Sequence, residues 1–159
     1  GVRALPGLVD GLDAPDADIR RRAVLAIAVI EDSTALAPLR NAIDDVDVDV
    51  RDRAAIALAQ HGDATGLTVL IDMVGAGRRD VEAAEALGRL SVHGPTDIVD
   101  HLHASYDAAV EDASRLRITQ ALGEIASPAA DVMLARLSAA PSRTIAATAQ
   151  IILAGRARS

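Results

Sequence analysis

Three histidines, His93, His101 and His103, stand close together in the sequence, with Asp97 and Asp100 among them. Imidazole and carboxylate groups are side chains that bind zinc and related metals. Side chains two residues apart on a helix point in different directions, so His101 and His103 would not converge on one ion. The sequence also has no cysteine to complete such a site. We therefore expect surface histidines here, with no metal ion and no other cofactor.

Recognisable motifs of enzyme chemistry are absent from the sequence. It contains no P-loop, no GxSxG motif and no HExxH motif, which would indicate phosphate binding, a serine nucleophile or a zinc protease. We therefore expect a chain that binds another molecule and is not itself an enzyme.

The composition excludes several classes of partner. The net charge is −7, with 23 acidic and 16 basic residues, whereas nucleic acids and anionic membranes select basic surfaces. We expect neither as a partner. No apolar run is long enough to cross a bilayer, and a cytoplasmic protein is expected. Half of the residues are hydrophobic, yet Tyr106 is the one aromatic residue, and an alanine-rich chain of this kind favours helices.

A polar pattern recurs along the chain. Residues 16–27 read DADIRRRAVLAI, and residues 47–58, which begin 31 positions later, read DVDVRDRAAIAL. The recurring polar positions are Asp16, Arg20, Asp47 and Arg51. An aspartate before a helix caps its first N–H groups, and an arginine one turn later reaches the turns of adjacent units. We interpret these four residues as a structural ladder.

Hydrophobic spacing predicts five pairs of helices, each with an A helix followed by a B helix. The A helices are expected near 4–13, 33–44, 64–75, 95–106 and 128–139, and the B helices near 17–30, 48–60, 79–91, 111–125 and 142–154. Ser33, Asp63 and Ser127 are the expected N-caps, with Pro128 at a first helical position.

Each B helix is expected to bury one apolar stripe. The residues of these stripes are Ile19, Ala23, Ala26, Ile27 and Ile30 in the first, Val50, Ala54, Ala57 and Leu58 in the second, and Ile118, Ala121, Leu122 and Ile125 in the fourth. A single hairpin cannot cover such a stripe, so the hairpins are expected to stack into a quasi-one-dimensional array.

The unit Asp-x-Asp-φ-Arg-x-x-Ala, where φ is apolar, resembles a HEAT repeat. The short period and the segment HGDATGLTVLIDMV (61–74) are similar to the subclass named after phycobilisome lyases. The resemblance implies an all-α fold, a right-handed α-solenoid of about five HEAT-like hairpins with the B helices on its concave side. We expect one repeat domain over 1–159, with repeats at 1–31, 32–62, 63–92, 93–126 and 127–155. Because Gly1 directly precedes a helical pattern, we expect a segment of a longer protein.

The B-helix side chains that point away from the core form the candidate binding surface. The predicted partner-binding residues are Arg22, Leu25, Val29, Arg53, Ile56, Gln60, Glu82, Glu85, Arg89, Arg117 and Gln120. The same rows continue with Glu124, Ile145, Thr148 and Ile152. The surface is apolar with arginines at its beginning and carries mixed charge further on, which suits a protein or peptide with acidic residues beside an apolar anchor.

Two functions remain open at this point, with a purely structural array in a longer regulatory protein as a third. The first is a non-catalytic scaffold that binds a protein or peptide. The second is an accessory subunit of a lyase or biosynthetic enzyme that presents a small molecule, as bilin lyases do. Among other HEAT relatives, deoxyhypusine hydroxylases use His-Glu pairs, but each histidine here precedes Gly, Leu or Ala. HEAT-like DNA glycosylases need aromatic residues and a basic groove, which this chain lacks.

The last helical pattern is apolar up to its end. Ile151, Ile152 and Leu153 are followed by only a short tail, although solenoids need polar caps. We expect either further repeats after this point or a partner that covers it.

Overall fold

The computed structural model describes residues 5–93 and 97–158, and within this part all regular secondary structure is helical. The chain divides into two compact units, residues 1–70 and 71–159, and the boundary falls within α5. Each unit is described here by itself. The prediction of a single repeat domain over 1–159 stays a prediction.

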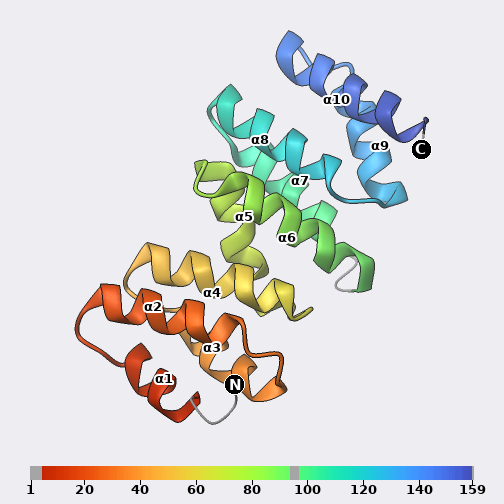
Figure 1. Ribbon diagram of the computed structural model, residues 1–159. Helices are drawn as coiled ribbons and strands as arrows, with labels where there is room; N and C mark the ends of the chain where they lie inside the picture. Colours follow the sequence, from red (N-terminus) through yellow and green to blue (C-terminus); the bar gives the residue numbers. More distant parts are fainter. Residues whose placement is uncertain (1–4, 94–96, 159) are drawn as a thin grey trace. The chain divides into compact units, whose positions relative to one another are not determined.

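The first unit contains two complete hairpins of an A helix and a B helix (Figure 1). Its elements are α1 (Leu5–Leu12), α2 (Ala17–Ala28), a 3-10 turn η2 (Ser33–Ala35), α3 (Leu36–Ala42), α4 (Val48–Gln60) and a second 3-10 turn η3 (Ala64–Gly66), followed by the start of α5 (Leu67–Ala76). Helix α2 packs against α1 and α4, and α3 packs against α4. The core between them is aliphatic and includes Ile27, Leu39 and Leu58.

The second unit continues the same alternation. It holds the rest of α5 and then α6 (Asp80–His93), α7 (Ile98–Ala108), α8 (Asp112–Gly123), α9 (Pro128–Leu137) and α10 (Arg143–Arg156). The B helices α6, α8 and α10 pack in succession, while α7 and α9 pack behind them. The side chains of Leu87, Leu102, Ile118, Leu122 and Leu134 fill the core. The fold class is therefore all-α, with stacked helical hairpins as in an α-solenoid.

Local capping chemistry sets several of the helix starts. Asp63 caps η3 by accepting a hydrogen bond from Thr65 N, and Ser127 caps α9 with Pro128 at its first position, both as predicted. The predicted cap at Ser33 is wrong, because Asp32 accepts the hydrogen bond from Thr34 N and Ser33 is already helical. The carboxylate one residue earlier therefore performs the capping.

The buried stripes of α4 and α8 are confirmed in full. In α2 the prediction is wrong for Ile19, which is 47% exposed, whereas Val50 at the equivalent position of α4 is 0% exposed. Ala26, also predicted to be buried, is only half-buried. Helix α4 has α2 beside it, while no B helix precedes α2 among the described residues. Val24, which the prediction omitted, is buried in the core instead.

The assignment of α10 is shifted by one position. Ile145, predicted to be on the exposed face, is buried together with Ala149. Alanines occur on several sides of α10, so the sequence pattern did not determine which side of the helix is buried. The buried pair Ile145 and Ala149 instead corresponds to Ile118 and Leu122 of α8.

Candidate partner-binding face

The turns of the first unit are joined by arginine–aspartate contacts. Arg20 Nη1 donates to the carbonyls of Ala14 and Pro15, and its Nε lies 2.8 Å from Asp45 Oδ2 in the next repeat. Arg51 Nη1 donates in the same way to the carbonyls of Asp45 and Val46. The Arg20 hydrogen bond lowers the pKa of Asp45 below its ordinary value. The N–H groups of these two arginines therefore bond mainly to the turns, and few of them remain available to a ligand.

Asp16 and Asp47, the other two residues of the predicted ladder, occupy the N-caps of α2 and α4. Asp16 accepts a hydrogen bond from Asp18 N, and Asp47 accepts hydrogen bonds from Asp49 N and Val50 N. Both carboxylates thus lie at the positive end of a helix, where a negative charge is favoured.

Arg21 forms a contact that sequence reasoning missed. Its Nε lies 3.0 Å from Asp47 Oδ1, and its second guanidinium nitrogen donates to the other oxygen. These hydrogen bonds lower the pKa of Asp47 to about 2 and raise the pKa of Arg21. The equivalent position in the next repeat is Asp52, so the contact does not recur and repeat comparison gave no signal for it.

On α2, three predicted residues form a continuous exposed patch. The side chains of Leu25 and Val29 are 48% and 79% exposed, and Arg22 is exposed beside them. Arg22 forms no ion pair or side-chain hydrogen bond with the rest of the described chain. The patch therefore combines exposed aliphatic surface with a cation that has no partner within the described residues.

On α4, the predicted residues are more buried, and one of them is paired within the chain. Arg53 Nε lies 2.8 Å from Asp49 Oδ2, one helical turn earlier, and only 23% of the Arg53 side chain is exposed. Ile56 is half-buried and Gln60 is exposed. The α4 part of the face thus has less apolar surface and less free charge than the α2 part.

On α6 of the second unit, the predicted residues Glu82, Glu85 and Arg89 are all exposed. Arg89 lies 3.7 Å from Glu85, and Glu82 lies 3.6 Å from Arg79. These are loose, solvent-exposed pairs that contribute little to stability. They leave the carboxylates accessible to another molecule.

Arg117 is placed differently from Arg22. Its Nε donates to the carbonyl of Val74, and its Nη2 donates to the carbonyl of Gly75 and to Ser114 Oγ. The guanidinium therefore caps the end of α5, where carbonyl groups lack helical partners. The selection of Arg117 as a partner-binding residue stays a prediction.

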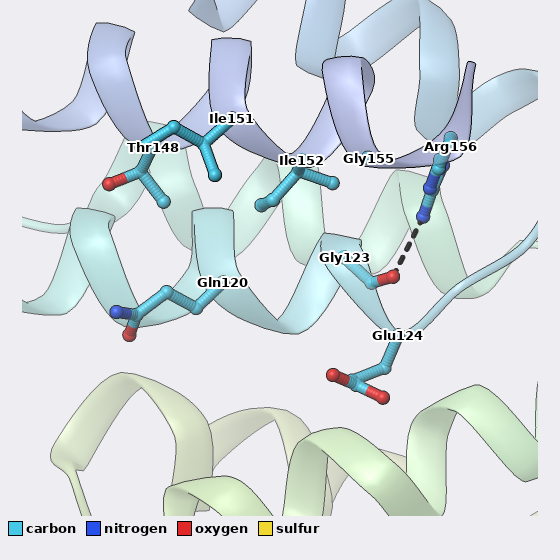
Figure 2. Close-up of a pocket in the computed structure, with 8 residues that line it drawn as sticks. All are labelled: Gln120, Gly123, Glu124, Thr148, Ile151, Ile152, Gly155 and Arg156. Carbon is cyan, nitrogen blue, oxygen red and sulfur yellow. Dashed lines mark hydrogen bonds between the residues drawn. The ribbon is translucent and has the colours of Figure 1, made fainter. Parts of the chain in front are cut away.

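Two grooves lie on either side of α8. The groove between α8 and α10 has a volume of about 410 Å³, and the groove between α6 and α8 about 320 Å³. Gln120 of α8 and Glu124, the C-cap residue that follows α8, line both grooves. In Figure 2, Gln120 and Glu124 extend from the side of α8 that lies away from α10, while Thr148 and Ile152 extend from α10 towards α8.

The end of α8 is held by Arg156, another residue that the sequence analysis did not select. Its Nη2 donates to the carbonyl of Gly123 (Figure 2) and to the carbonyls of Leu122 and Ile125. Arg156 also pairs with Asp131. Only its position near the end of an apolar helix could have drawn attention to it. It performs for α8 the capping that Arg117 performs for α5.

The histidines have structural contacts of their own. His101 Nδ1 lies 2.9 Å from the carbonyl of Asp97, and His103 Nε2 lies 3.0 Å from Arg136 Nη1. The side chain of His93 lies outside the described residues. Within the described part, no group of three or more His, Asp or Glu side chains could hold a metal ion.

Comparison with known families identifies the repeat. The family model described as HEAT repeats matches residues 5–88. The chain belongs to the HEAT-repeat family. No curated protein sequence matches this HEAT-repeat chain. Within the described residues, none of its helices has both the length and the apolar character needed to span a bilayer.

Solved structures with a similar fold include two repeat proteins. The complex of CpcE and CpcF of phycocyanin lyase from Nostoc sp. PCC7120 matches with a TM-score of 0.58 and 19% identity, over 94% of this chain and 63% of that chain. A designed armadillo repeat protein matches with a TM-score of 0.50 and 18% identity, over 95% of this chain and 81% of that chain. The HEAT-repeat chain thus spans less than two thirds of the lyase chain, and identities this low establish the α-solenoid fold alone.

Proposed function

We propose that this HEAT-repeat chain is a non-catalytic scaffold that binds a partner protein or peptide on the exposed faces of its B helices. The observation that carries the proposal is the patch of Arg22, Leu25 and Val29 on α2. Leu25 and Val29 remain exposed beside Arg22, and Arg22 forms no ion pair or side-chain hydrogen bond within the described residues.

The partner segment that fits α2 has an apolar anchor flanked by acidic residues. Leu25 and Val29 lie one helical turn apart, as do Arg22 and Leu25, so a single bound segment can contact all three. Burial of the two aliphatic side chains supplies affinity, while Arg22 supplies steering and orientation. Ile56, Gln60 and Arg53 extend the contact onto α4.

The test compares the full-length protein with an Arg22→Glu/Arg53→Glu variant in affinity purification from the native host. We expect a partner that is retained by the wild type and lost by the variant. The matched control is Val46→Asp, which changes an exposed aliphatic residue in the turn before α4 and should leave retention unchanged. Circular dichroism of each variant must show unaltered helix content. Equal retention by the wild type and the double variant would show that the B-helix face is not the binding surface.

The second candidate is an accessory subunit of a lyase, favoured by the fold similarity to the CpcE and CpcF complex over 94% of this chain. Such a subunit would present a small molecule, in the manner of a bilin lyase. Its test is mass spectrometry and absorption spectroscopy of the protein purified from its native host. A bound small molecule, with no protein retained, would favour this function over the scaffold.

A further inference from the structure

The second unit presents an apolar groove beside an acidic one, with α8 as the shared wall. In the α8–α10 groove, the Ile151 side chain is 70% exposed, and Ile152 lies next to it. Gly123 forms part of the floor, and a Cβ there would lie only 3.2 Å from Ile152 Cδ1. The absence of a side chain at Gly123 therefore keeps this groove open along α8.

The neighbouring α6–α8 groove carries unbalanced negative charge. Asp80, Glu85 and Glu124 line it. The side chains of Asp80 and Glu124 form no ion pair or hydrogen bond within the described residues, and the one ion pair of Glu85 is 3.7 Å long. Arg117 also lines this groove, but its donors are directed to the carbonyls of Val74 and Gly75.

Glu124 connects the two grooves, since it lines both. Arg156, the cation of the α8–α10 groove, donates to the carbonyls at the end of α8 and pairs with Asp131. Glu124 is therefore left to interact with an incoming positive charge. A cation bound to Glu124 in the α6–α8 groove would lie beside the apolar side chains of Val81 and Ala84.

We propose that these paired grooves bind a partner segment in which an apolar residue stands next to an arginine or lysine. The apolar side chain enters the α8–α10 groove against Ile151 and Ile152. The cationic side chain enters the α6–α8 groove against Glu124 and Glu85. This inference rests on the scaffold function proposed above and gives it a second, oppositely charged site in the second unit.

The experiment measures binding of short synthetic peptides to the full-length protein by fluorescence anisotropy. One series carries a leucine and an arginine at varied spacing, and a matched series carries glutamate in place of the arginine. We expect at least one leucine–arginine peptide to bind and its glutamate counterpart to bind at least about tenfold more weakly. Binding should weaken as salt is raised, because the pair lies at the protein surface.

Variants then locate the site. Glu124→Gln and Ile151→Ser should each lower the affinity for the peptide by about tenfold. Val132→Ser, at an equally exposed aliphatic position on α9, should leave the affinity unchanged. Glu124→Arg should shift the preference towards the glutamate peptides. Absence of binding by every peptide, equal binding of both series, or insensitivity to Glu124→Gln and Ile151→Ser would overturn the proposal.

The α2 variant separates this inference from the proposed function. The Arg22→Glu/Arg53→Glu variant should leave peptide binding to the second unit unchanged, because Arg22 and Arg53 belong to the first unit. If the native partner is lost with that variant but no peptide binds, the scaffold function holds and the paired-groove site does not. If the peptides bind as expected and retention of the native partner is unchanged by the α2 substitutions, the proposed role of the α2 patch is wrong.

Discussion

Arg20 reaches from the first turn of α2 to Asp45, with 2.8 Å between Nε and Oδ2, and so ties one turn to the next along the array. The contact is largely shielded from solvent, with 11% and 12% of the two side chains exposed. Asp45 also accepts a hydrogen bond from the backbone of Asp47. One carboxylate thus fixes both the incoming arginine and the turn before α4.

The first prediction concerns this carboxylate. Asp45→Ala should lower the free energy of unfolding by about 2 kcal/mol, because it removes charge-assisted hydrogen bonds and leaves a shielded guanidinium partly unpaired. Urea denaturation at fixed pH measures the change. Asp44→Ala, at the exposed neighbouring position, should change stability by less than about 0.5 kcal/mol. Similar losses in both variants would show that the contact adds nothing to stability.

The second prediction concerns acid. The pKa of Asp47 is lowered from its ordinary value of 3.8 to about 2 by the Arg21 hydrogen bonds. A carboxyl group whose pKa is lower in the folded state than in the unfolded state stabilises the folded protein, and the full stabilisation is present at pH values above the unfolded-state pKa. This stability is lost as the pH falls from about 4 to about 2. In an NMR titration, Asp47 should titrate near pH 2 in the wild type and at a higher pH in Arg21→Gln. An unshifted Asp47 in the wild type would contradict the prediction.

The third prediction compares two equivalent positions of the repeat. Val50→Ala should destabilise the protein by about 2 kcal/mol, because Val50 is fully buried and its methyl groups would be lost from a packed core. Ile19→Ala should cost less than about 1 kcal/mol, since nearly half of that side chain is already exposed. Chemical denaturation of the two variants, side by side, distinguishes these outcomes, and a reversed order would contradict the packing described for α2.

The fourth prediction concerns the close approach of α6 and α8. A Cβ on Gly88 would lie 2.6 Å from the carbonyl oxygen of Glu124, so Gly88→Ala should destabilise by about 1–3 kcal/mol. Gly75→Ala is the matched control in α5, where the nearest atom, Ser105 Oγ, lies at an ordinary 3.8 Å. It should be neutral or stabilising by up to about 1 kcal/mol, because alanine is the better helix former. Thermal unfolding monitored by circular dichroism measures both.

The order and limits of the helices were predictable because hydrophobic spacing and capping residues are local signals. Asp63, Ser127 and Pro128 stand at helix starts as predicted. The error at Ser33 arose because two residues in a row, Asp32 and Ser33, can both cap, and only the backbone geometry distinguishes them. Likewise, the burial of Ile19 depends on whether another helix covers it, which its own spacing does not report.

The candidate site was less predictable than the fold. The exposure of Arg22, Leu25 and Val29 follows from helical geometry once the buried face is known. Arg117 occupies the same helical row as Arg22, but its guanidinium bonds to carbonyls more than forty residues earlier in the sequence. Such contacts depend on tertiary structure. The selection of the face residues as binding residues, Arg117 included, stays a prediction.

The Arg20 and Arg51 contacts repeat with the same spacing, because each arginine donates to carbonyls five and six positions before it. Each of these two units therefore holds its own turn with its own arginine, and Arg20 adds a contact to Asp45 of the next unit. A duplicated copy of these 31 residues would therefore include the arginine that stabilises its own turn. Arrays of this kind can lengthen by whole copies during evolution, and an engineer could extend this one by the same step.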